Sequence, residues 1–161
     1  MINAAKSELG LVSKQIIERI DSSVRNQKQT NQWKNSASVI EWFKGIPNKS
    51  KHTFIIFDID NFYRSISADL LNRAIDYAKQ FINISRQDID VIMHARKSLL
   101  FDKTSTAWVK KGNNNMFDVT MGSFDGAEIC ELVGLYILNI LSSKYHDNGS
   151  IGLYRDDGQH H

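Results

Sequence analysis

An apolar run that ends abruptly on acidic residues restricts the fold of this chain more than any other part of its sequence. Residues 53–57 are all β-branched or aromatic, and after Thr53 they are uniformly apolar. Such a run is typical of a β-strand that is buried on both faces. Asp58 ends the run, and Asp60 follows at the two-residue spacing that returns it to the same face. A carboxylate at the tip of a buried strand is costly without a cation or a hydrogen-bond partner. This strand end is therefore a candidate cation site.

A second acidic strand end lies near the C-terminus. A short run with strand character, residues 151–154, is followed by Arg155, Asp156 and Asp157. Adjacent carboxylates oppose each other's ionisation, and chains usually tolerate such a pair where a cation sits against it. The simpler interpretation is a solvated Asp-Asp-Gly turn that closes a hairpin. If the two strands lie side by side, Asp58 meets both aspartates, and three carboxylates suit Mg²⁺ rather than zinc.

Length and composition favour one domain with a real core. The chain has 161 residues, of which 42% are hydrophobic and 24% charged, as in soluble globular proteins. Its one cysteine, Cys130, excludes a disulfide within the chain, and its neighbours predict a buried thiol inside a helix. The N-terminus lacks the apolar region of a secretion signal, and the apolar helix pattern around residues 132–141 is too short to span a bilayer. We therefore expect an intracellular protein, in the nucleus or the cytoplasm, with no membrane partner.

Basic residues gather in two places. Lys49, Lys51 and His52 precede the acidic strand. Charge runs are usually solvated faces, and contact with nucleic acid is the alternative. The second group lies in the middle of the chain and consists of Arg96, Lys97, Lys103, Lys110 and Lys111.

The periodicity of apolar residues and the capping signals predict an α+β fold. Ser67 is a predicted N-cap, and Ser85 with Asp88 makes a predicted capping box. We expect a small antiparallel or mixed sheet with helices packed on one face. Residues 1–52 would be a helical lead-in, and residues 53–161 would form the core of the same single domain. Helices are predicted over residues 8–25, 36–45, from 68, from 86 to about 100, and 126–145, and a loop over 26–35. Strands are predicted over residues 53–57, 106–110, 117–121 and 151–154. We expect the second and third of these strands to pair through a turn at residues 112–115.

Three blocks, in this order, resemble motifs A, B and C of a reverse transcriptase palm, most closely those of Penelope-like retroelements and group II intron enzymes. Motif A, an apolar strand followed by an aspartate, four residues and an aromatic, is matched by Asp58 and Tyr63. Motif B, a glycine-centred loop that opens a helix, is matched by residues 121–123. Motif C, Tyr-x-Asp-Asp in a turn, is matched by residues 154–157.

The chain also departs from the family. Residues 124–127 lack the prolines of motif B, and Arg155 stands where the family usually carries a small or apolar side chain. The resemblance covers residues 10–158, without the fingers and thumb motifs. It therefore implies the central, palm piece of a longer polymerase.

The resemblance implies an RNA-directed DNA polymerase that catalyses nucleotidyl transfer onto a primer 3′-hydroxyl. Two Mg²⁺ ions, with Mn²⁺ as the alternative, would be bridged by Asp58 and Asp156, and Asp157 would add a weaker contact. The carbonyl of Ile59 would complete the shell of the nucleotide-bound ion. The implied partners are an RNA or DNA template with its primer, deoxynucleoside triphosphates, and the fingers and thumb regions.

The resemblance also implies three nucleotide-binding residues. The amides of Phe62 and Tyr63 would contact phosphate, and the ring of Tyr63 would exclude a 2′-hydroxyl. Gly122 would let the backbone approach the nascent base pair, where a side chain would clash. The alternative for Tyr63 is a core aromatic, and we expect Asp60 to cap the following turn rather than to bind metal.

Three other functions stay open on the sequence. The chain could be a catalytically inactive palm remnant of a retroelement, or a non-catalytic nucleic-acid-binding scaffold whose aspartates hold no metal. A metal-dependent phosphatase or nuclease would need a histidine or glutamate aimed at the same site, and no such motif accompanies either strand end.

Overall fold

The computed structural model describes residues 7–28, 30–33, 35–97, 100–101, 103–108, 116–145 and 150–154. The fold is α+β and mostly helical, with a small two-stranded parallel sheet. The helices are α1 (Glu8–Gln27), α2 (Ser36–Gly45), the 3₁₀ turn η2 (Lys49–Lys51), α3 (Phe62–Ser65), α4 (Ala68–Ala78), α5 (Arg86–His94) and α6 (Gly126–Tyr145). The strands are β1 (Asn31–Trp33), β2 (Leu100–Phe101), β3 (Ala107–Trp108) and β4 (Gly152–Tyr154).

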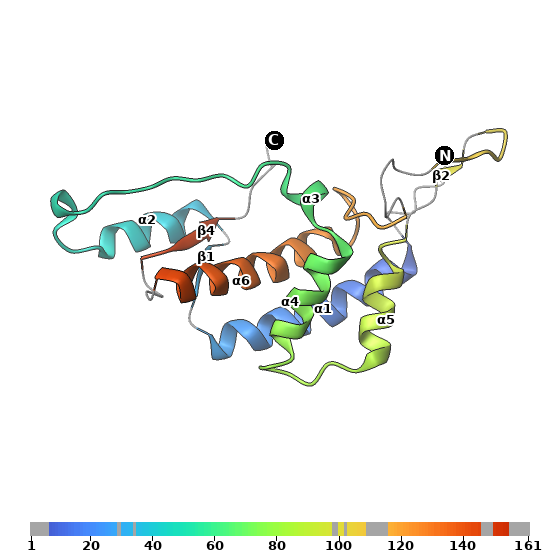
Figure 1. Ribbon diagram of the computed structural model, residues 1–161, viewed down its shortest axis with the longest axis horizontal. Helices are drawn as coiled ribbons and strands as arrows, with labels where there is room; N and C mark the ends of the chain where they lie inside the picture. The colour runs from blue at the N-terminus through green and yellow to red at the C-terminus, as the bar shows by residue number, and fades with distance from the viewer. Residues whose placement is uncertain are drawn as a thin grey trace.

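Helix α6 is the centre of the fold, as Figure 1 shows. It contacts α1 and α4 on one side and the strands β1 and β4 on the other. Its apolar residues, among them Ile129, Leu132 and Leu135, are fully buried, and Cys130 is buried as predicted. Burial of side chains of this size is the main stabilising term of such a core.

The predicted bounds of α6, residues 126–145, agree with the structure. The expectation that no apolar stretch is long enough for a bilayer was wrong, because the helix continues the apolar pattern toward its N-terminus through Ile129 and Cys130. By length and composition α6 could cross a membrane, and half of that stretch is buried inside the fold. Its glutamates Glu128 and Glu131 form ion pairs with α1.

Serine caps define the beginnings of the helices around α6. Ser67 caps α4, and Ser85 with Asp88 forms the predicted capping box of α5. Helix α5 ends at His94, six residues before the predicted end near residue 100. The chain turns there, and Arg96, just after the turn, is buried.

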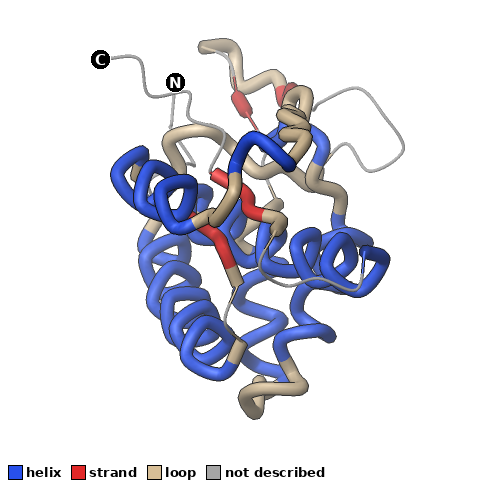
Figure 2. The backbone as a smooth tube through the Cα atoms, turned by 90° about the vertical axis from the view of Figure 1, so that its left-hand side faces the viewer, coloured by secondary structure: helices blue, strands red, loops and turns tan. Residues whose placement is uncertain are grey.

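The parallel sheet joins two distant parts of the chain. Strand β1 pairs with β4 in the register Asn31 to Gly152 and Trp33 to Tyr154. The sheet lies between α2 and α6, and Figure 2 shows its short strands bordered by helices. The prediction of a loop over 26–35 missed β1. Because β1 pairs with β4, and Ile17 of α1 belongs to the core, residues of the lead-in share one core with the rest.

The second strand pair differs from the prediction. Strand β3 pairs antiparallel with β2, and Phe117 makes an isolated bridge with Lys97. The predicted pairing of 106–110 with 117–121 is therefore wrong for the described residues, while residues 109–115 lie outside them. The physical reason is that β2 is nearer to β3 in the sequence than residues 117–121 are, so pairing with β2 closes a shorter loop.

The predicted buried strand over 53–57 is also wrong. The segment is extended but is not paired as a strand, and it crosses the molecule between η2 and α3 (Figure 1). Ile55 and Ile56 are 83% and 96% exposed. β-Branched residues favour an extended backbone by themselves, whereas burial requires neighbouring strands on each side. Among the described residues no such pair of neighbours covers this segment.

Candidate metal and nucleotide site

The residues after the exposed segment anchor Asp58 to the core. Ile59 packs against the buried cluster, and Phe62 is only 4% exposed. Between them Asn61 adopts a left-handed backbone (φ 52°), which turns the chain into α3 and which Asn tolerates better than most residues. Asp58 therefore lies where the chain passes from solvent to core, with its own side chain exposed.

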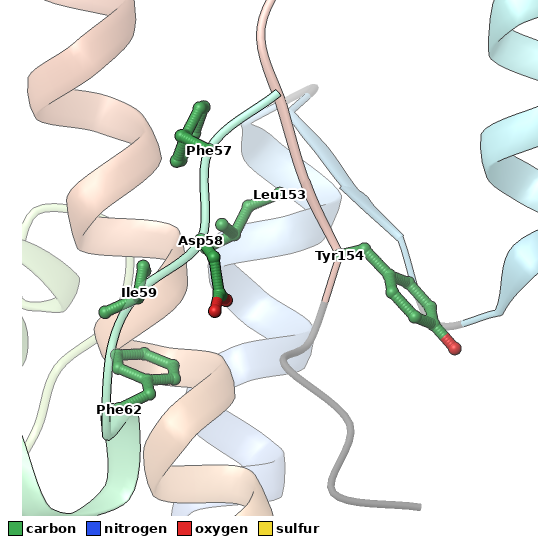
Figure 3. A pocket seen from close by; sticks show the side chains of 6 residues that line it. All are labelled: Phe57, Asp58, Ile59, Phe62, Leu153 and Tyr154. Carbon is green, nitrogen blue, oxygen red and sulfur yellow. The ribbon is translucent and has the colours of Figure 1, made fainter. Parts of the chain in front are cut away.

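A small pocket joins this anchor to the end of β4. Its lining consists of two segments far apart in the sequence, 57–62 and 153–154 (Figure 3). In Figure 3 the carboxylate of Asp58 points into the space between the two segments, and the ring of Tyr154 points away from it. The pocket has a volume of about 30 Å³, which admits a water molecule or an ion but not a nucleotide. The lining residues are Phe57, Asp58, Ile59, Phe62, Leu153 and Tyr154.

A close approach of Trp33 to Gly152 fixes β4 in this position. A Cβ on Gly152 would overlap three atoms of the Trp33 ring, so a larger residue there would displace the indole. The ring of Trp42 packs on Trp33 with centroids 4.9 Å apart. These tryptophans pack on each other and on Gly152, and they hold the strand that precedes Asp156 and Asp157 in the sequence.

The candidate aspartates of motif C lie outside the described residues, as does Arg155. Of the four residues predicted to hold metal, Asp58 and Ile59 line the pocket, and Tyr154, two residues before Asp156, lines it as well. No group of three or more His, Cys, Asp or Glu side chains suited to a metal occurs among the described residues. The oxygen donors of Asp58 and Ile59 fit Mg²⁺ as part of a larger set.

Asp60 has local hydrogen bonds instead of a place in the pocket. Its Oδ1 accepts a hydrogen bond from Asn61 Nδ2 at 2.9 Å, and its backbone oxygen accepts one from Ser65 Oγ at 3.1 Å. Within the described part of the chain, no side chain caps the N-terminus of α3. Asp60 thus stabilises the turn, although not by the capping bond that was expected.

The ring of Tyr63 contacts the beginning of α6. One carbon of this ring lies 3.7 Å from the position that a Cβ on Gly126 would occupy, at the first residue of α6. Tyr63 is partly buried against the core. Gly122 has φ +86°, a conformation that strongly favours glycine, and is exposed beside Met121. Neither Tyr63 nor Gly122 lines the small pocket.

A buried ion pair, which sequence reasoning missed, holds the loop that precedes α6. Arg96 Nη2 donates to Asp125 Oδ1, and the two side chains are 3% and 0% exposed. The backbone oxygen of Arg96 also accepts a hydrogen bond from the amide of Asp118. Arg96 is therefore not part of a basic surface, contrary to the group in which the sequence placed it.

Other charged residues also have structural partners. Lys49 Nζ donates to the carbonyls of Lys44 and Ile46, so it closes the C-terminal end of α2. Glu131 pairs with Arg25 at 3.0 Å, which joins α6 to α1. Lys51, Lys97 and Lys103 are exposed; Lys110 and Lys111 lie outside the described residues.

The groups with clearly shifted pKa values lie on helices outside the pocket. Burial raises the pKa of Tyr77, whose ring packs between Phe81 and Tyr136. Burial alone would raise the pKa of Asp88, but hydrogen bonds from Ser85 and from Arg19 outweigh it and lower the pKa. Both residues therefore belong to the scaffold rather than to the candidate site.

No protein-family model matches the chain, and the comparisons with curated proteins and with solved structures find no similar protein.

Proposed function

We propose that this chain is the palm of a reverse transcriptase, which transfers a deoxynucleotide to the 3′-hydroxyl of a primer paired with an RNA or DNA template. One observation carries the proposal. Asp58 of motif A lines the same pocket as Leu153 and Tyr154, which lead into motif C. Asp58 therefore lies beside the strand that precedes Asp156 in the sequence, which supports a shared metal site.

The metal would be held by oxygen atoms. Asp58 and Asp156 would bridge two Mg²⁺ ions, Asp157 would add a weaker contact, and the carbonyl of Ile59 would complete one shell. When bound, such a pair activates the primer hydroxyl and neutralises charge on the leaving pyrophosphate. The small pocket suits this division of roles, since it has room for an ion while the nucleotide would lie outside it.

The nucleotide would lie beside Tyr63, near the beginning of α6. The ring of Tyr63 packs on Gly126, so α6 would hold the ring in place at the side of the bound sugar. The amides of Phe62 and Tyr63 begin a short helix and would face the triphosphate. Gly122, with its left-handed backbone, would allow the motif B loop to approach the base pair closely.

Primer extension tests the proposal. The full chain is assayed on a primed RNA template with deoxynucleotides and Mg²⁺, beside Asp58→Asn and Asp156→Asn. Loss of a residue that hydrogen-bonds to a metal ligand typically lowers activity about 10–100-fold, so loss of a direct ligand should lower extension by at least about 100-fold. The matched control is Asp90→Asn, an exposed carboxylate on α5. Equal extension by Asp58→Asn and the wild type would refute the polymerase, and no extension by the wild type would favour the inactive palm remnant.

A second experiment tests whether Tyr63 excludes the 2′-hydroxyl of the nucleotide or only packs in the core. In the variant Tyr63→Val, we expect incorporation of ribonucleotides to rise relative to deoxynucleotides. A residue that only packs would lower the melting temperature and leave this ratio unchanged. The ratio therefore decides between the two roles, whatever the change in stability.

A further inference from the structure

The most exposed apolar stretch of the described chain is the edge segment, residues 53–58. Ile55 and Ile56 are 83% and 96% exposed, and the flanking Phe54 and Phe57 are 43% and 48% exposed. The segment runs along the outer edge of the molecule in Figure 1. Four consecutive apolar side chains in this state form an unusual surface, because exposed apolar residues normally occur singly.

The backbone of the edge segment, like its side chains, is free to contact a partner. It is extended, and its N–H and C=O groups make no backbone hydrogen bond to another described residue. A run of β-branched and aromatic residues without proline and with unpaired backbone groups is a template for pairing with another strand. The surface therefore favours an extended partner over a helical one.

We propose that the occupant is the same segment of a second copy, paired antiparallel about a two-fold axis between Ile55 and Ile56. In this register Ile55 of one copy lies opposite Ile56 of the other. Phe54 likewise lies opposite Phe57, so each pair joins two exposed apolar side chains. Aromatic and β-branched cross-strand pairs of this kind are the stabilising units of antiparallel sheets.

The charges at the two ends of the edge segment favour antiparallel over parallel pairing. Lys51 and His52 precede the segment, and Asp58 and Asp60 follow its apolar part. Antiparallel pairing brings the basic end of one copy to the acidic end of the other, with Lys51 near Asp60. Parallel pairing would set like charges side by side, which is unfavourable. The segment is thus complementary to itself in one orientation only.

Helix α2 extends the interface beyond the strand. None of its residues is buried, although it carries Ile40 and Phe43, which are 52% and 43% exposed. The ring of Phe43 packs on Phe54 with centroids 5.2 Å apart, so the helix and the edge segment form one continuous apolar surface. A stable interface buries about 1,000 Å² or more in total, which a short strand pair reaches only with such a neighbour.

Sedimentation equilibrium of the full chain over a dilution series tests the pairing. We expect association from 18.4 kDa to twice that mass. Ile56→Lys should raise the dissociation constant at least about tenfold. This side chain is almost fully exposed, so circular dichroism should show an unchanged fold. The matched control Val12→Lys, at an exposed position on α1, should associate like the wild type.

A charge exchange tests the register. Lys51→Asp and Asp60→Lys should each weaken the dimer, and the two together should restore it. The proposal is overturned if the wild type stays monomeric, if Ile56→Lys associates equally well, or if mass grows without a limit at the dimer. Hydrogen exchange of the amides of residues 53–58 tests whether the segment pairs with a second copy. Protection that is independent of concentration would assign the segment to an intramolecular partner and would also overturn the dimer.

Discussion

The buried pair of Arg96 and Asp125 gives the sharpest prediction on stability. Both side chains are within 3% of complete burial, so neither charge is compensated by solvent if its partner is removed. Removal of one partner of a buried pair typically costs about 3–5 kcal/mol. We expect this loss for Arg96→Met, which leaves the Asp125 carboxylate uncompensated. Against a typical total of about 5–15 kcal/mol, such a loss is large.

The pair is also incompletely hydrogen-bonded, which predicts the result of removing both charges. Arg96 Nε and Asp125 Oδ2 have no hydrogen-bond partner among the described residues. A half-satisfied buried pair is often replaced by apolar residues at little cost. The double variant Arg96→Met/Asp125→Leu should therefore be more stable than Arg96→Met alone, although it carries one more substitution.

Urea unfolding followed by circular dichroism at the helical band measures these free energies for the wild type, both single variants and the double variant. If Arg96→Met is too unstable to fold, Arg96→Lys, which keeps the charge and loses the planar fork, supplies the first step. The reasoning is refuted if the single losses stay below about 1 kcal/mol, or if the two losses add without coupling.

Two further predictions concern the scaffold of the site. Gly152→Ala should lower stability by about 1–3 kcal/mol, because the new Cβ would overlap the Trp33 ring; an unchanged melting temperature would contradict this packing. Asp88→Asn should cost about 1 kcal/mol at neutral pH, since it removes the capping box and the bond to Arg19. Because the fold lowers the pKa of Asp88, its contribution is full above the unfolded value near 4 and is lost as the pH falls through the lower folded pKa. Urea titrations of the wild type and the variant should therefore converge in acid, and a constant difference at every pH would contradict the assignment.

Local signals predicted the helices well. Ser67 and Ser85 cap α4 and α5 as expected, because a capping hydroxyl acts on amides within three residues. The predicted bounds of α6 were also correct, since a helix that is apolar on nearly every side must be central. For α2 the cap is Asn35 rather than Ser36, which is a shift of one residue.

The misses involve partners that are distant in sequence. Strand β1 contains polar residues and shows no strand pattern; it is held by Gln32 Nε2 donating to the Glu131 carbonyl and by Trp33 over Gly152. Likewise, no rule of sequence spacing predicts the ion pair of Arg96 and Asp125. Such contacts depend on the packing of the whole chain and not on local preference.

The apolar run over 53–57 shows the same limit in another form. Its residues favour an extended backbone, and the segment is extended. Burial was inferred from apolarity alone, and burial requires strands on both sides. At the candidate site, Asp58 lines one pocket with Leu153 and Tyr154, although β4 pairs with β1 and not with residues 53–57. The positions of Asp156 and Asp157 stay predictions, because they lie outside the described residues.

The central claim is that Asp58 and Asp156 hold the same divalent ion. Titration with Mn²⁺, followed by the electron paramagnetic resonance of the free ion, measures this binding without any need for catalysis. The account predicts that Asp58→Asn and Asp156→Asn each weaken binding at least about tenfold and that the double variant is little worse than either single one. Asp90→Asn should bind like the wild type. Unchanged affinity in either single variant, or fully additive losses, would contradict a shared site.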